Sequence, residues 1–179
     1  MILTVKDSGV FLEQPTKEVD PTSEEARETV DALLAAVQEL DATVTDSRVA
    51  GLAANQIGHN SSIFVARLTL GADNELLPDL TVCINPTILY HIIPDKTVSS
   101  LLDSAVGVEG CYSLPGENYV VRRHMMVSLA YFDLEGTSHL VRLIGVPAII
   151  SQHEMDHLEG NHIAKIGVRA HQADAPPST

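Results

Sequence analysis

The chain has 179 residues, a length typical of one domain that can bury a hydrophobic core. Its formal net charge of −13 and its scattered basic residues argue against direct nucleic-acid binding, which depends on Lys and Arg contacts to phosphate. No run of about 18 apolar residues predicts a membrane span, and the first residues resemble neither a secretory leader nor an import peptide. We therefore expect a cytoplasmic protein without a membrane partner.

An amphipathic helix is predicted at roughly residues 23–42. The run Thr22-Ser-Glu-Glu25 fits a capping box that follows Pro21. Glu and Asp on the outer side of this helix account for part of the negative charge. Apolar residues then recur at helical spacing, namely Ala26, Val30, Leu33, Leu34, Val37 and Leu40.

The middle of the chain consists of short segments rich in β-branched and aromatic residues, separated by turn residues. We interpret Asn85-Pro86 as a break between two of these segments and Asp133–Gly136 as a hairpin turn between two others. We interpret residues 94–106 as a mobile loop near the functional site. The segments predict strands at 62–66, 81–84, 87–93, 125–132 and 139–143.

Helical spacing returns between Val146 and Leu158, and Gly160 lies where that helix would end. Residues 169–179 contain little that a core would bury, so we expect a flexible C-terminal tail. These patterns together predict one α+β domain over residues 1–168.

His153-Glu-Met-Asp-His157 fits the pattern HExxH. Two His residues four positions apart lie on one face of a helix and can bind one divalent ion, while Glu154 can reach a metal-bound water. This is the arrangement of metal-assisted hydrolysis of an amide-type bond. The alternative is a chance match on a solvated helix, although the apolar Pro-Ala-Ile-Ile before the motif favours a buried face.

A catalytic metal site needs a third protein ligand and an open position. No Glu follows Glu159, and Ile163 stands where the extended pattern HExxHxxGxxH requires a His. The third ligand is therefore expected upstream, and Cys111 is the best-placed thiol, after the polar and flexible run Gly107–Gly110. Two His and one Cys suit zinc or iron.

Two further residues need an interpretation. Cys83 lies in a predicted strand, so we interpret it as a small buried hydrophobe and do not expect a disulfide. Asp156 has two possible roles: it accepts a hydrogen bond from a ligand His, or it is a solvent-exposed acid on the helix.

Three segments, in this order, resemble the peptide deformylase family. They are Gly51-Leu-Ala-Ala-Asn-Gln56-Ile-Gly58, Glu109-Gly-Cys-Tyr-Ser113 and Gln152-His-Glu-Met-Asp-His-Leu158. The resemblance covers residues 2–166 or so. It implies antiparallel β-sheets packed around a central metal-binding HExxH helix. It also implies removal of the formyl group from the N-terminal formyl-methionine of new polypeptides, with release of formate.

The resemblance assigns a role to each matching residue. It implies that Glu154 is the general acid/base and that Gln56 polarises the formyl oxygen together with the backbone N–H of Tyr112. It further implies one divalent metal, Fe(II) in the cell, although the ligand set also accepts Zn(II), Ni(II) or Co(II). The implied metal ligands are Cys111, His153 and His157. The implied substrate-binding residues are Ala50, Gly51, Glu109 and Gly110, with Val146, Ile149 and Ile150 in the pocket for the methionine side chain.

Three features depart from the family pattern. Val49 replaces a glycine expected two residues before Gly51. Asn118 replaces an Arg that many members carry, although Arg122 and Arg123 lie nearby. Residues 167–179 stand where many bacterial members have a long, often basic helix, so ribosome docking through such a helix is not expected. The expected partners are N-formylmethionyl peptides, either short or nascent. The alternatives left open are a hydrolase of another N-acyl group and a metal- or peptide-binding homologue without turnover.

Overall fold

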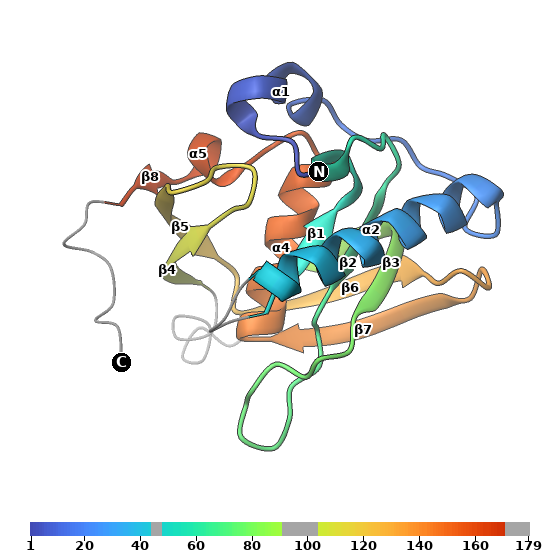
Figure 1. Cartoon of the computed structure of the whole chain (residues 1–179). Coiled ribbons are helices and arrows are strands. Elements are labelled where there is room, and N and C mark those ends of the chain that lie inside the picture. The colour runs from blue at the N-terminus through green and yellow to red at the C-terminus, as the bar shows by residue number, and fades with distance from the viewer. Residues whose placement is uncertain (44–47, 91–103, 171–179) are drawn as a thin grey trace.

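The computed structural model describes residues 1–43, 48–90 and 104–170 (Figure 1), so the predicted loop at 94–103 and most of the predicted tail lie outside the described residues. None of the described helices is both long enough and apolar enough to cross a membrane. The helices are α1 (Val5–Leu12), α2 (Glu24–Thr43), the 3-10 helix η1 (Ala54–Ile57), α4 (Val146–Leu158) and α5 (Ile163–Ile166). The strands are β1 (Gly51–Ala53), β2 (Ile63–Ala66), β3 (Thr81–Tyr90), β4 (Ala105–Gly110), β5 (Asn118–Arg123), β6 (Met126–Phe132), β7 (Ser138–Ile144) and β8 (Val168–Arg169).

The strands form two separate sheets. The larger sheet has the order β1-β2-β3-β6-β7 and the smaller one the order β4-β5-β8, with antiparallel pairing between all named strands. Figure 1 shows α4 between the two sheets and α2 across β1, β2 and β3 of the larger sheet. The prediction of an α+β fold with antiparallel sheets is thus confirmed.

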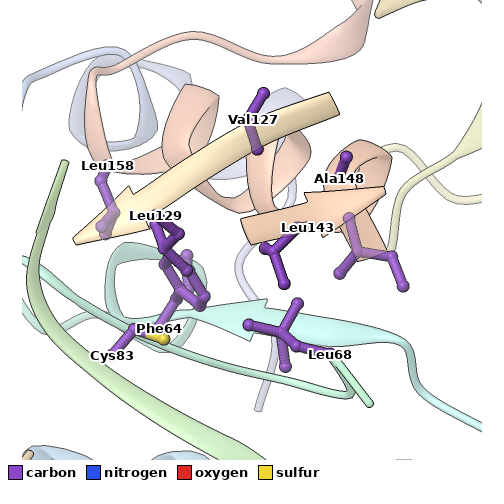
Figure 2. Close-up of a cluster of buried hydrophobic side chains, with 11 residues drawn as sticks. Phe64, Leu68, Cys83, Val127, Leu129, Leu143, Ala148 and Leu158 are labelled. Atoms are coloured by element: carbon purple, nitrogen blue, oxygen red, sulfur yellow. The ribbon is translucent and has the colours of Figure 1, made fainter. Parts of the chain in front are cut away.

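Strand β2 is buried on both faces because a helix covers each of them. Ile63 and Val65 pack with the apolar side of α2, whereas Phe64 and Ala66 point to the opposite face, in a cluster that includes residues of α4. This alternation follows from the two-residue period of a strand. Figure 2 shows the cluster on the α4 side, in which Cys83 is fully buried, as predicted.

The start of α2 differs from the predicted capping box. The Ala26 N–H donates to the Ser23 hydroxyl at 3.2 Å, so Ser23 provides the cap and Thr22 instead bonds to Asp20. Glu25 does not complete a capping box, because its carboxylate accepts a hydrogen bond from Ser61 at 3.0 Å. The interpretation of the Thr22–Glu25 run was therefore wrong by one residue.

Two strand interpretations also need correction. Asn85-Pro86 does not separate two strands, because β3 continues through it with a register irregularity between Ile84 and Thr87. The Asn85 side chain bonds to both backbone polar groups of Val19, which stabilises this bulge. β4 begins at Ala105, so the end of the predicted 94–106 loop and the supposedly flexible Gly107–Gly110 run are strand.

Several short elements had no prediction, namely α1, β1, β4, β5, α5 and β8. The strands among them are short or apolar on one face only, so their hydrophobic pattern is weak. Arg169 was expected at the start of the tail, but it belongs to β8 and pairs with Tyr119 of β5.

Candidate metal centre and active site

A pocket of about 180 Å³ opens where the two sheets and α4 meet. One wall comes from the start of β1, the opposite wall from the end of β4, and the floor from α4. Val146 lies at the exposed first residue of α4 and does not line it. The lining residues are Ala50, Gly51, Gln56, Glu109, Gly110, Cys111, Tyr112, Ile149, Ile150, His153 and Glu154.

Cys111, His153 and His157 form a group that could hold a metal ion. One ligand atom from each residue lies within 4.8 Å of the others. Cys111 directly follows β4, and its Sγ lies 3.2 Å from Nε2 of His157, while the two imidazoles stand edge to face on successive turns of α4. A thiolate and two imidazoles are a donor set that suits zinc or iron.

Glu109 fixes the orientation of His153. Oε2 of Glu109 lies 2.9 Å from Nδ1 of His153, which leaves Nε2 of that ring to face the cluster. Arg123 holds the Glu109 carboxylate through two contacts, at 2.8 and 2.9 Å, and also binds Asp156 at 2.5 Å. The carboxylate that contacts His153 is therefore Glu109. Asp156 takes neither of the roles proposed from the sequence, because it binds Arg123.

The electrostatics of this network favour a bound cation. Burial disfavours charge on both Glu109 and His153, but their charged partners outweigh it. Arg123 and His153 lower the pKa of Glu109 to about 2, and Cys111 and Glu109 raise the pKa of His153 to about 10. The negative groups that stabilise an imidazolium would equally stabilise a divalent ion, so the residues fit a metal.

Glu154 lies beside the cluster as a buried carboxyl group. Burial raises its pKa to about 7, and its Oε2 has no hydrogen-bond partner among the described residues. A Cβ placed on Gly51 would lie 2.6 Å from Oε1 of Glu154, so the absence of a side chain at Gly51 makes room for this carboxylate. The close approach is a reason for the glycine that the sequence did not reveal.

Gln56 is held at both ends of its amide. Oε1 accepts from the Ala53 N–H at 2.9 Å, and Nε2 donates to the Ser113 hydroxyl at 3.2 Å and lies 3.6 Å from Sγ of Cys111. The amide N–H group is thus next to the Cys–His–His cluster. Tyr112 lines the same pocket with a partly exposed ring.

Two residues of the site, Arg123 and Ser113, were given no role from the sequence. Arg123 is only 5% exposed, and the alternation of buried residues at Tyr119, Val121 and Arg123 along β5 was the available signal. Ser113, adjacent to the cysteine motif, is also buried. Asn118, the departure from the family pattern, pairs with Gly110 across β4 and β5.

The family model for polypeptide deformylase matches residues 1–168 of the chain. Among curated relatives, a peptide deformylase of Latilactobacillus sakei is 39% identical over 121 residues, which are 64% of this chain and 60% of the relative. A peptide deformylase of Nostoc is 34% identical over 149 residues, or 83% of this chain and 70% of the relative. The chain thus spans about three-fifths of the length of the first of these relatives.

Solved structures of similar proteins agree with this match. A Plasmodium falciparum peptide deformylase in complex with an inhibitor aligns with a TM-score of 0.71 and 26% identity, over 97% of this chain and 91% of that one. A peptide deformylase from Thermotoga maritima aligns with a TM-score of 0.72 and 26% identity, over 93% of this chain and 95% of that one.

Proposed function

The chain belongs to the polypeptide deformylase family, and from this premise we propose that it removes the formyl group from N-terminal formyl-methionine and releases formate. The substrates are N-formylmethionyl peptides, short or nascent, in the cytoplasm. The observation that carries the proposal is the buried Glu154 carboxyl beside the Cys–His–His cluster, whose Oε2 has no hydrogen-bond partner in the described part of the chain.

We propose Cys111, His153 and His157 as the metal ligands. A divalent ion held there would supply Lewis acidity, which lowers the pKa of a bound water and polarises a carbonyl group. The metal ligand set does not select one ion, and Fe(II) is our proposal for the cell, with Zn(II), Ni(II) or Co(II) as possible replacements in a purified protein.

Glu154 is the proposed general base. In its ionised form the carboxylate would take the proton of the attacking water and later return it to the departing amine of methionine. A carboxyl group with a pKa near 7 can do both near neutral pH, because both of its forms are accessible.

Gln56 is the proposed donor to the formyl oxygen, together with the backbone N–H of Tyr112. Negative charge develops on this oxygen when water adds to the carbonyl group, and a donor already in place stabilises it without reorganisation. The contacts of Gln56 with Ala53 and Ser113 support this role, since they fix the amide before substrate arrives.

Ile149 and Ile150 provide the proposed apolar contact for the methionine side chain, next to Glu154 on α4. Val146 belonged to the same expectation, but its exposure at the start of α4 makes it a rim residue at most. The peptide backbone would pass between Ala50 and Gly51 on one side and Gly110 on the other. Glu109 would then act through His153 and not by touching the substrate.

The direct test is steady-state turnover of formyl-Met-Ala and acetyl-Met-Ala by protein purified without oxygen, with the metal content measured on the same sample. We expect rapid release of formate and slow or no release of acetate. Faster cleavage of the acetyl peptide would show a hydrolase for another N-acyl group. Absence of turnover with a full complement of metal would show a binding protein.

A further inference from the structure

The backbone of Val49 is held on both sides by an ion pair. Its N–H donates to Oδ1 of Asp41 at 2.7 Å, and its C=O accepts from Nη1 of Arg67. Asp41 and Arg67 also bind each other at 2.7 Å, and Arg67 donates to the carbonyl of Pro78 at 3.1 Å. Asp41, Val49 and Arg67 thus form a closed ring of contacts that we call the Val49 clamp.

The clamp is well buried and charged. Arg67 is 4% exposed, and its contacts lie at the end of α2, the approach to β1 and the segment before β3. Partial burial opposes the charge on Asp41, but the Val49 N–H and the Arg67 guanidinium lower the pKa of this carboxyl. The Asp41 carboxylate therefore stays ionised at neutral pH while it binds Val49 and Arg67.

The clamp adjoins the pocket because Val49 directly precedes Ala50, which lines the pocket. Tyr112 and Ala50 both line the pocket. The clamp thus lies at the mouth of the active site, one residue before its first wall.

The backbone N–H and C=O groups of β1 and of the residues before it determine what a peptide could bind there. β1 is the last strand of the larger sheet, so its outer edge is open among the described strands. The Arg67 N–H donates to the carbonyl of Ala50. Because successive residues of a strand direct their polar groups to opposite sides, those of Gly51 point away from β2. The Ala53 N–H is already bound to Gln56.

Counting only partners in the part of the chain that the structure describes, Gly51 is therefore the one position from 49 to 53 with both polar groups available to a peptide. A substrate placed by its formyl group beside Glu154 would have its first residue opposite Gly51, because Gly51 contacts Glu154. In an extended peptide, alternate residues direct their polar groups to the same neighbouring strand. The third residue of the substrate would then lie opposite Val49, where the N–H is occupied.

We propose that Asp41 and Arg67 are positioning residues that limit backbone recognition by β1 to the start of the substrate. The inference rests on the proposed deformylase function. It means that the third residue of a formyl-methionyl peptide gains no hydrogen bond from the Val49 N–H. The enzyme would therefore accept formyl-Met dipeptides nearly as well as longer chains.

The test compares kcat/KM of the metal-loaded enzyme for formyl-Met-Ala-amide and formyl-Met-Ala-Ala-amide. We expect the third residue to raise kcat/KM by less than about threefold, because a gained hydrogen bond would contribute about fivefold. A larger gain in the wild-type enzyme would overturn the inference. No turnover of either peptide would refute the proposed function and this inference with it, whereas turnover with a large gain refutes the inference alone.

Variants at Asp41 provide the second part of the test. Asp41→Ala releases the Val49 N–H, and we expect the gain from the third residue to rise to about fivefold. Asp41→Asn is the matched control, because it keeps an oxygen acceptor and should retain the wild-type ratio. An unchanged ratio in a folded, metal-loaded Asp41→Ala protein would overturn the role of the clamp. If that variant does not fold, the wild-type peptide comparison decides.

Discussion

Nδ1 of His153 lies 2.9 Å from Oε2 of Glu109, and Arg123 binds both oxygens of the same carboxylate. A proposed metal ligand on α4 is thereby oriented by a residue of β4 and another of β5. The smaller sheet accordingly does more than close the pocket, since it determines which nitrogen of His153 faces the cluster.

Glu109→Gln should weaken metal binding. The amide keeps the size of the side chain but loses the charge that orients His153 and pairs with Arg123. We expect metal affinity to fall about 10–100-fold, measured by competition with a coloured chelator. Glu135→Gln is the control, because Glu135 is exposed in the turn between β6 and β7 and belongs to neither the pocket lining nor the Cys–His–His cluster. Equal affinities of the two variants would contradict the role given to Glu109.

The same contact predicts a pH dependence of stability. The folded-state pKa of Glu109 is lowered from 4.5 to about 2, so its contribution is complete above the unfolded pKa and is lost as the pH falls towards 2. The size is on the order of 3 kcal/mol. Urea unfolding of chelator-treated protein at pH 7 and pH 3 should show a smaller decrease for Glu109→Gln than for the wild type. Parallel decreases would show that another group controls the acid sensitivity.

The sequence located the site better than it described the network around it. His153, Glu154 and Cys111 stand in short motifs whose spacing is local, and they line one pocket. The contact between Arg123 and Glu109 depends on strand pairing that a weak hydrophobic pattern does not predict. A resemblance can assign a role to Glu109 but not its partners.

The roles of Asp41, Arg67 and Val49 could not be predicted from the sequence, because they depend on long-range contacts. Asp41 and Arg67 are 26 residues apart, and neither stands in a motif. Val49 was noted as a departure from the family pattern, but its consequence depends on the fold, because the Val49 side chain is buried in the α2 core and its backbone is bound by the clamp. Such roles appear only when three distant segments are brought together.

Glu154→Ala should abolish turnover and leave the metal in place. Glu154 is proposed to move a proton and not to bind the ion, so we expect kcat to fall at least about 100-fold. Formate release and metal content are measured on the same sample. A variant that turns over at the wild-type rate would show that the proposed base is wrong.

Cys111→Ser, unlike Glu154→Ala, should remove the bound metal. Serine is a poor replacement for a thiolate ligand, so we expect loss of bound metal together with loss of activity. Metal content unchanged by this substitution would remove Cys111 from the proposed ligands, whatever happens to the activity.

Gly51→Ala should lower kcat without loss of metal, because the added methyl group displaces Glu154. The added Cβ would lie 2.6 Å from Oε1 and 2.9 Å from Cδ of Glu154, so the carboxylate must move. Because a displacement of about 1 Å at a catalytic group can cost about 100-fold, we expect a decrease in kcat of that order with normal metal content. Gly107→Ala is the matched control, since a Cβ there meets no atom within 4 Å and should leave kcat unchanged. If Gly51→Ala retained full kcat, the space at this glycine would not be what positions Glu154.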